Sequence, residues 1–285
     1  MSETDPPVAE RQERVSAWFT DLRDRICATF EAIEDELEGE NAERMAHIPP
    51  GRFRRSAWQR AQEEGIDDPG GGVMSVMNGR VFEKVGVNVS VVRGQFSDQF
   101  AQEIPGTDED RTFWACGISL VAHMQSPHVP AVHMNTRHLI TGKSWFGGGA
   151  DLNPIVENEQ DTADFHAGLK AACDKHDPAY YPRFKAWADD YFFIKHRNEA
   201  RGVGGIFYDY IDTGDWEADF TFTRDVGQAF LDTYPPLVRK HMHEPWTDAD
   251  RQRQLFQRGR YTEFNLVYDR GTRFGLQTGG NPDAV

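Results

Sequence analysis

Four histidines fall on consecutive segments of this sequence and could meet around a metal ion. His123 and His133 are ten residues apart, and the turn residues Ser126-Pro127 between them would bring both onto one face of a sheet. His166 and His196 fall on the next two predicted helices. Imidazole is a good ligand for Fe, Zn, Cu or Ni, and it also accepts Mn. Because no HExxH spacing is present, isolated hydrogen-bonded histidines are the alternative.

A second group of polar side chains follows His133 on the same predicted strand. His133, Asn135 and Arg137 alternate in the sequence, so on a strand they share one face. An imidazole, an amide and a guanidinium on one face suit a ligand that carries carboxylates, because arginine donates paired, charge-assisted hydrogen bonds to them. A solvated sheet face is the alternative interpretation.

Two further segments combine residues that could contact a ligand. Trp145–Pro154 carries three consecutive glycines after two aromatic residues, which predicts either backbone packed against a flat ligand or a bulge at a sheet edge. The segment is neither a GxGxxG nor a P-loop, so nucleotide binding has little support. Asp269 ends the predicted strand Tyr261–Asp269, where Glu263 and Asn265 share its face. A half-solvated strand would show the same pattern.

Composition limits the class of protein that could use these residues. The chain has 285 residues, of which 39% are hydrophobic and 12% aromatic, enough for a sizeable core. Its net charge of -15 argues against nucleic acid as a partner, because a phosphate backbone recruits lysine and arginine. A local arginine cluster can still bind an acidic small molecule on an acidic protein.

The cysteines and the N-terminal sequence indicate where the protein works. Cys27, Cys116 and Cys173 are odd in number and widely spaced, so they are not a disulfide framework. The N-terminal sequence MSETDPPVAERQER lacks the apolar core of a signal peptide. No apolar run approaches the roughly 20 residues that span a membrane. We therefore expect a cytoplasmic protein without a membrane span.

The elements that must position these residues follow from hydrophobic periodicity and turn signals. Residues 1–7 read as a flexible tail and residues 39–72 as irregular chain. The predicted strands are Val73–Asn78, Arg80–Gln95, Arg111–Met124, Ala131–Thr141, Ser144–Val156 and Gly204–Ile211, with a hairpin of Tyr261–Asp269 and Arg273–Thr278. The predicted helices are Val8–Leu37, Thr162–Lys175, Asp177–Ala200 and Phe222–His243, the last kinked at Pro235-Pro236.

The order of elements predicts the fold class. Many consecutive strands with short connections indicate an antiparallel meander rather than alternating strands and helices. We expect an α+β fold in which helices cover one antiparallel sheet, formed by a single domain over residues 1–285. The residues alone thus support an enzyme or binding protein with a histidine, arginine and aspartate site for an acidic ligand.

Several long stretches of the chain resemble the oxygen-dependent coproporphyrinogen III oxidase family. The resemblance covers residues from about 70 to the end. Its segments are Gly86–Ser90, Gly117–His123 through Asn135–Arg137, Trp145–Pro154, Tyr191–Gly205 (YFFIKHRNEARGVGG) and Arg258–Gly280 (RGRYTEFNLVYDRGTRFGLQTGG). Such long matches are far more specific than a short motif.

This resemblance implies both an architecture and a reaction. It implies a large flat antiparallel sheet sandwiched between helices, and a homodimer. It also implies that two propionates of coproporphyrinogen III are oxidatively decarboxylated to vinyl groups, giving protoporphyrinogen IX. The oxidant is O2, with CO2 and hydrogen peroxide as by-products. No flavin, haem or nicotinamide is expected.

The resemblance also assigns roles to residues of this sequence. His133 matches a proton donor, and Asp269 matches a carboxylate that works on the pyrrole. We expect Arg137 to grip a propionate. The implied substrate-binding residues are Ser119, Asn135, Thr136, Arg137, Gly279, Gly280 and Asn281. The implied ligands of a divalent metal ion, Mn²⁺ among others, are His123, His133, His166 and His196.

Two features depart from the family pattern. Position 281 is Asn where relatives often have Arg, which would alter that substrate contact. The family usually continues beyond the position of Val285 with an apolar, proline-containing segment that helps to form the dimer. Two other functions remain open from sequence: a non-catalytic porphyrin-binding protein on the same scaffold, and a histidine-metal enzyme acting on another acid.

Overall fold

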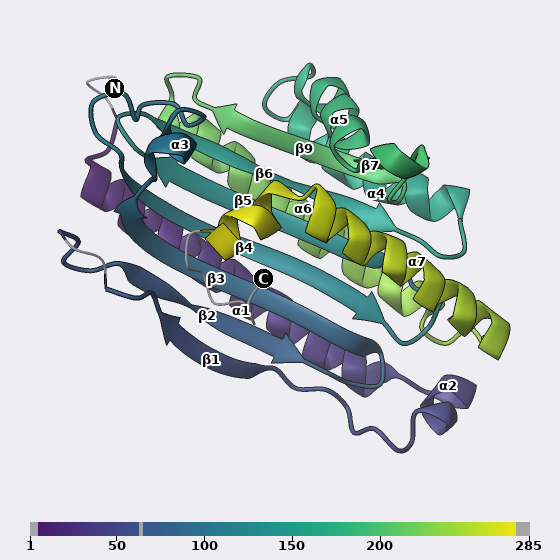
Figure 1. Ribbon diagram of the computed structural model, residues 1–285. Coiled ribbons are helices and arrows are strands. Elements are labelled where there is room, and N and C mark those ends of the chain that lie inside the picture. The colour runs from purple at the N-terminus through teal and green to yellow at the C-terminus, as the bar shows by residue number, and fades with distance from the viewer. Residues whose placement is uncertain (1–4, 63–64, 278–285) are drawn as a thin grey trace.

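Figure 1 shows a computed structural model of the chain, which describes residues 5–62 and 65–277. Within these residues, seven strands form one antiparallel sheet in the order β1-β2-β3-β4-β5-β6-β9. Their bounds are β1 Arg54–Gln59, β2 Gly70–Met77, β3 Phe82–Gln95, β4 Thr112–Met124, β5 Ala131–Ile140, β6 Ser144–Asn153 and β9 Gly204–Ile211. A separate short ladder joins β7 Phe193–Ile194 to β8 Glu199–Ala200.

Helices lie on both faces of the sheet. They are α1 Val8–Glu36, α2 Gly39–Arg44, α3 Asp98–Ala101, α4 Glu159–Asp174, α5 Tyr180–Tyr191, α6 Trp216–His241, α7 Asp248–Val267 and α8 Arg270–Gln277. In Figure 1, α1 and α6 run behind the sheet and α7 crosses in front of it. This arrangement confirms the α+β class with a single antiparallel sheet between helices. No helix in the two described ranges has the length and apolar character that crossing a membrane requires.

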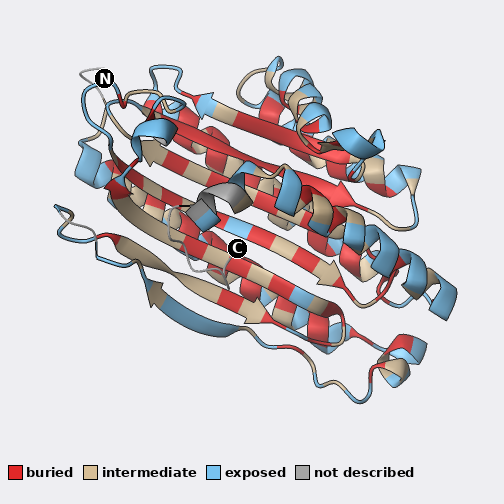
Figure 2. Cartoon of the chain, viewed as in Figure 1, coloured by how far each residue is buried: buried red, intermediate tan, exposed pale blue. Residues whose placement is uncertain are grey.

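The main core lies between the sheet and the helices behind it. Alternate residues of each strand point to this side, as Val85, Val87 and Val89 do on β3. Phe30 of α1 stacks on Phe82 with ring centroids 4.5 Å apart, and both side chains are fully buried. Burying a side chain of this size contributes about 2–3 kcal/mol. Figure 2 shows the resulting bands of buried residues along the central strands.

The opposite face of the sheet, which we call the front face, is covered only in part. The α5 helix packs on β9, where Tyr191 stacks on Phe207 with centroids 4.3 Å apart. The α7 helix is held to β3 because Arg258 donates two hydrogen bonds, of 2.9 and 2.7 Å, to Glu83. The edge strand β1 is exposed along most of its length (Figure 2). The central strands β4 and β5 lie between these covered regions, and their polar side chains point toward a face that a ligand can reach.

Most sequence predictions for the first 211 residues are confirmed, within a few residues at the ends. The exceptions begin with residues 39–72, which contain α2, β1 and the start of β2 rather than irregular chain only. The helix predicted to reach Ala200 ends at Tyr191, because the chain turns into the β7–β8 ladder and Asn198 takes a left-handed φ of 54°. Beyond residue 211, the helix predicted over Phe222–His243 is α6, which begins earlier, at Trp216, and runs through Pro235-Pro236 as one element.

The predicted C-terminal hairpin is wrong. Residues 248–267 and 270–277 are helices, and a capping box between Thr247 and Asp250 starts the first of them. Tyr261 and Phe264 are three residues apart and both are buried, which is the spacing of one helix face. The aromatic residues of this segment also suit a strand, so the two patterns compete over a short window.

A buried glutamate ties α1 to the turn before β3. The side chain of Glu34 is fully buried and accepts hydrogen bonds from four backbone amides. The donors are Gly51 at 3.0 Å, Arg80 at 2.8 Å, Val81 at 3.0 Å and Phe82 at 2.8 Å. A Cβ at Gly79 would lie 2.4 Å from the carboxylate, so the turn needs glycine there.

Replacing Glu34 by alanine should destabilise the protein strongly. The change leaves several buried amides without an acceptor, and we expect a loss of at least about 3 kcal/mol in the free energy of unfolding, measured by urea denaturation. The matched control is Asp35→Asn, because Asp35 is 54% exposed and pairs with Arg52 at the surface. That change should cost under about 1 kcal/mol. Equal losses in the two variants would contradict the role given to Glu34.

Candidate active site

The front face carries a row of polar side chains across adjacent strands. Ser119 of β4 lies opposite Asn135 of β5, and Gly117 lies opposite Arg137. His133 lies opposite Asp151 of β6. Because the strands alternate, all these side chains point away from the main core. Ser119 is exposed, and the predicted sharing of one face by His133, Asn135 and Arg137 is confirmed.

Hydrogen bonds connect the polar row along β5. Arg137 Nη1 donates to Asn135 Oδ1 at 3.2 Å, and Asn135 Nδ2 lies 3.0 Å from His133 Nε2. His133 Nδ1 lies 2.9 Å from Asp151 Oδ1. The bonds are mutually consistent when Asn135 donates to Nε2 and Nδ1–H donates to Asp151. The arginine thus orients the amide, and the amide and Asp151 together orient the imidazole.

The carboxylate behind His133 belongs to a buried ion pair. Arg201 Nη2 donates to both oxygens of Asp151 at 2.8 Å, and the two side chains are only 2% and 1% exposed. Burial alone would raise the pKa of Asp151, but the Arg201 guanidinium and the hydrogen bond from His133 outweigh it and lower the pKa to about 2. Asp151 therefore stays ionised and keeps its hydrogen bond to His133 Nδ1.

Arg201 also anchors α7 over the site. Its guanidinium carbon lies 4.4 Å from the ring centroid of Tyr261 and 4.7 Å from that of Phe264, both on α7. It donates to Asn265 Oδ1 at 2.7 Å. These contacts with rings and an amide hold the cation between the sheet and the helix.

A second carboxylate pairs with Arg137 at the other end of the row. Arg137 Nη2 donates to Asp209 Oδ2 of β9 at 2.7 Å. The Arg137 side chain remains 30% exposed, whereas Asp209 is 13% exposed. The pair crosses β6 above Gly147, where no side chain intervenes. The guanidinium is therefore both held in place and open to a ligand.

Asp269 lies on the same side of the sheet as Arg137. Its Oδ1 accepts from Tyr191 at 2.8 Å, and its Oδ2 accepts from the amide of Thr272 at 2.7 Å. The ring of Tyr191 stacks on Phe207, which faces front on β9. Burial raises the pKa of Tyr191, and Asp269 raises it further. The phenol therefore stays protonated and donates to Asp269.

The four predicted metal ligands each have separate surroundings. His123 meets Tyr261 edge-to-face at 5.1 Å between ring centroids, and burial together with Arg258 lowers the pKa of His123 to about 4. His166 Nε2 lies 3.0 Å from the carbonyl oxygen of Val203, and its Nδ1 lies 3.0 Å from the hydroxyl of Tyr181.

His196 is not on a helix but in the short turn Lys195–Arg197. Its two ring nitrogens bond Tyr268, at 2.7 Å, and Glu263, at 3.1 Å. Nowhere in residues 5–62 and 65–277 do three or more His, Cys, Asp or Glu side chains gather in a way that could hold a metal ion. The described residues thus do not form a metal centre, and three of the four imidazoles use both nitrogens in other hydrogen bonds.

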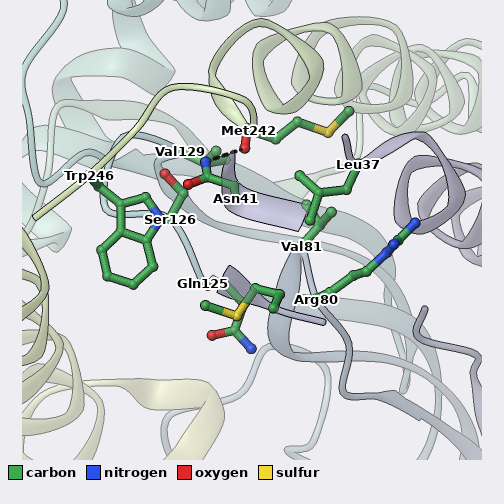
Figure 3. Close-up of a pocket in the computed structure, with 10 residues that line it drawn as sticks. Leu37, Asn41, Arg80, Val81, Gln125, Ser126, Val129, Met242 and Trp246 are labelled. Carbon is green, nitrogen blue, oxygen red and sulfur yellow. Dashed lines mark hydrogen bonds between the residues drawn. The ribbon is translucent and has the colours of Figure 1, made fainter. Parts of the chain in front are cut away.

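Two small cavities lie outside the polar row. One of about 30 Å³ lies between the end of the sheet and α7, and His123, Arg201 and Arg258 are among the residues that line it. The other, of about 10 Å³, lies between Leu37, Val81 and Trp246, where Asn41 donates to the carbonyl of Met242 (Figure 3). The second space holds at most a water molecule. Neither of these two cavities is large enough for a macrocycle.

Other predicted substrate-binding residues lie elsewhere or outside the described residues. The Thr136 side chain is fully buried on the core side of β5, as alternation requires, so the front face meets only its backbone. Gly279, Gly280 and Asn281 lie outside the described residues.

Sequence reasoning gave no role to Asp151, Arg201, Asp209 or Tyr191. Asp151 follows the three glycines within Trp145–Pro154, which was the available signal. Asp209 lies on β9, Arg201 lies just before β9, and Tyr191 ends α5. No spacing along the chain connects these three residues to His133 or Arg137. Their contacts exist only because β9 pairs with β6 at the end of the sheet.

The front face combines an arginine that is 30% exposed with an imidazole hydrogen-bonded to a buried carboxylate. These groups are suited to binding an acidic organic molecule and to proton transfer. Comparison with known proteins gives the family. Residues 14–285 match the family model for coproporphyrinogen III oxidase. The chain belongs to this family.

Relatives named oxygen-dependent coproporphyrinogen-III oxidase align with nearly the whole chain. The protein of Rickettsia bellii (strain RML369-C) is 55% identical over 276 residues, which is 97% of this chain and 95% of the relative. The proteins of Rickettsia africae (strain ESF-5) and Rickettsia akari (strain Hartford) are each 54% identical over the same shares. The resemblance seen in the sequence is thereby confirmed.

Proposed function

We propose that the front face of the sheet holds coproporphyrinogen III and that the chain converts two of its propionates to vinyl groups with O2. The product is protoporphyrinogen IX, an intermediate of haem synthesis. The observation that carries this assignment is the match to the family over residues 14–285, together with a front face that offers an open arginine. The activity is that of the named relatives, which are similar over 97% of the chain.

Each decarboxylation transfers two electrons and consumes one proton. The balance is R–CH2–CH2–COO⁻ + O2 + H⁺ giving R–CH=CH2 + CO2 + H2O2. An electron-rich pyrrole can react with O2 without a flavin, haem or nicotinamide once its N–H is deprotonated or polarised. The resulting hydroperoxide would take a hydrogen from the propionate β-carbon, and the loss of CO2 leaves the vinyl group.

Three side chains each carry out one part of this reaction. Arg137 binds the carboxylate of the reacting propionate through the N–H groups not used by Asn135 and Asp209. Asp269 accepts the pyrrole N–H or its proton. His133 supplies the proton for peroxide from Nε2 as an imidazolium, in a state in which the Asn135 amide no longer donates to Nε2, because Asp151 occupies Nδ1. The front-face positions of these residues support this division.

Contacts with the rest of the macrocycle stay predictions. Ser119 and Asn135 lie next to each other on the front face and suit hydrogen bonds to a second acid arm or a ring N–H. Gly279, Gly280, Asn281 and the backbone of Thr136 are further predicted contacts. We also propose a homodimer, as the resemblance implies, and a cytoplasmic location, which suits three buried cysteines without disulfides.

Formation of protoporphyrin from coproporphyrinogen III in air tests the activity. The purified protein should give protoporphyrin fluorescence after oxidation of the product, and should consume O2 as it does so. Binding of the tetrapyrrole without any O2 uptake would instead indicate a non-catalytic porphyrin-binding protein.

Arg137→Ala should mainly raise KM. Losing a charge-assisted hydrogen bond to a propionate costs about 1.5–3 kcal/mol of binding, so KM should rise roughly tenfold or more while kcat changes less. Steady-state rates at varied coproporphyrinogen III measure this. Arg52→Ala is the control, because Arg52 is 53% exposed and pairs with Asp35 away from the front face. An unchanged KM in Arg137→Ala would assign the propionate contact to another residue.

Asp269→Asn should lower kcat by at least about a hundredfold, because general acid–base groups contribute this much and an amide is not a base. The amide oxygen can still accept from Thr272 while Nδ2 donates to the hydroxyl oxygen of Tyr191, so the variant should melt within a few degrees of the unchanged protein. Tyr191→Phe is the companion variant: it removes a hydrogen bond to Asp269 but keeps the carboxylate, so its kcat should fall much less. Wild-type rates in Asp269→Asn would remove Asp269 from the mechanism.

A divalent metal ion, Mn²⁺ or another, on His123, His133, His166 and His196 stays a prediction from the resemblance. In this structure each of these side chains has its own hydrogen-bond partners or ring contacts, and we propose that the reaction does not need the metal ion. If the reaction needs no metal ion, treatment with a chelator should leave kcat unchanged, measured with metal analysis of the same sample. Loss of activity that Mn²⁺ alone restores would show that the histidines gather when the metal binds.

A further inference from the structure

The end of β9 next to Arg137 contains a β-bulge. Tyr208 lies opposite Gly148 and Ile211 lies opposite Phe146, so Asp209 and Tyr210 together face the single residue Gly147. Bulges are frequent beside active sites, where they re-aim a side chain. Alternation from Phe207 places Asp209 on the front face, beside Arg137 of the strand beyond β6, and the extra residue Tyr210 turns its amide toward the Asp209 carboxylate. Figure 1 shows β9 as the edge strand on that side of the sheet.

The bulge depends on an unfavourable backbone conformation. Tyr210 has a φ of 55°, a left-handed value that bulky residues rarely adopt. Two contacts offset it: the ring of Tyr210 packs on Trp145 with centroids 5.5 Å apart, and its amide donates to Asp209 Oδ1 at 3.1 Å. Strain of this kind concentrates at functional sites. One oxygen of Asp209 is thus fixed by the strained residue, and the other is left for Arg137.

Gly147 makes room for the ion pair. A Cβ at this position would lie 2.4 Å from Asp209 Oδ1 and 3.0 Å from Arg137 Nε. Any larger residue would push the carboxylate and the guanidinium apart. The three features, a glycine, a bulge and a left-handed tyrosine, come from two strands and converge on one hydrogen bond of 2.7 Å.

The bond decides where the guanidinium points. Asn135 and Asp209 accept from its two terminal nitrogens, one from each. Arginine has five N–H donors, so within the described part of the chain the others remain for a ligand. A free arginine side chain loses several rotamers when it binds, and fixing it beforehand removes that cost from binding.

We propose that Asp209 is a positioning residue: it holds Arg137 in the orientation that receives a propionate, and the left-handed Tyr210 of the bulge fixes the Asp209 carboxylate through its amide. The inference rests on the proposed role of Arg137 in substrate binding. Asp209 has a second, opposing effect, because its negative charge weakens the attraction of Arg137 for a carboxylate. The positional effect is the larger one in this proposal, and two substitutions separate the effects.

Asp209→Ala removes both the position and the charge, whereas Asp209→Asn removes the charge but keeps an oxygen that can accept from Arg137. We expect KM for coproporphyrinogen III to rise about tenfold in Asp209→Ala, with kcat within about threefold, and to change less than about threefold in Asp209→Asn. Equilibrium binding of coproporphyrin III, the stable oxidised form of the substrate, should weaken in the same order, measured by fluorescence.

Two substitutions of Tyr210 form a matched pair of variants that keep Asp209 itself unchanged. Tyr210→Gly tolerates the left-handed conformation, so KM should stay within about twofold. Tyr210→Val disfavours it, because β-branched residues resist positive φ, so KM should move toward that of Asp209→Ala. Thermal melting of all four variants monitors folding, and the Tyr210 pair decides the matter if Asp209→Ala does not fold.

An unchanged or lowered KM in Asp209→Ala would overturn the inference, as would equal increases in the alanine and asparagine variants or in both Tyr210 variants. A purely structural role would lower the melting temperature and leave KM unchanged. The Arg137→Ala result distinguishes failure of the proposed substrate contact from failure of the inference about Asp209. If Arg137→Ala leaves KM unchanged, the proposed substrate contact fails; if Arg137→Ala raises KM and Asp209→Ala does not, only the inference about Asp209 fails.

Discussion

The buried ion pair between Asp151 and Arg201 joins the parts of the site. Asp151 comes from the sheet and fixes the imidazole of His133, while Arg201 comes from the approach to β9 and binds the rings of α7. Two ions that are at most 2% exposed are costly to bury unless each satisfies the other. Their pairing therefore constrains the sheet, the β8–β9 connection and α7 to one arrangement, and the imidazole of His133 is placed within it.

The sheet distributes two tasks between its faces. Strands that alternate strictly send apolar side chains to α1 and α6 and polar side chains to the front, so the same segments supply both the core and the site. The glycines of β6 have no side chains that would project from the front face between β5 and β9. Side chains from outer strands reach across them, as Asp209 does to Arg137. A flat macrocycle needs such a surface more than it needs a deep cavity.

The arrangement favours binding and proton transfer with groups whose charge is fixed in advance. Asp151 is kept ionised by Arg201, Arg137 is held by Asp209 and Asn135, and Asp269 is hydrogen-bonded by Tyr191 and Thr272. Fixed dipoles and charges of this kind need little reorganisation when the substrate reacts. The histidines expected to bind a metal are instead distributed among separate hydrogen bonds, and His123 lies next to α7.

The sequence by itself determined six of the seven strands of the sheet, the common face of His133, Asn135 and Arg137, and the family, because period-two alternation and long matching segments are local signals. It could not determine that residues 248–277 are helical, since aromatic residues in a short window suit either element. Nor could it place Asp209 beside Arg137 or Arg201 beside Asp151. These pairs are 72 and 50 residues apart in sequence, and only the pairing of β6 with β9 brings them together.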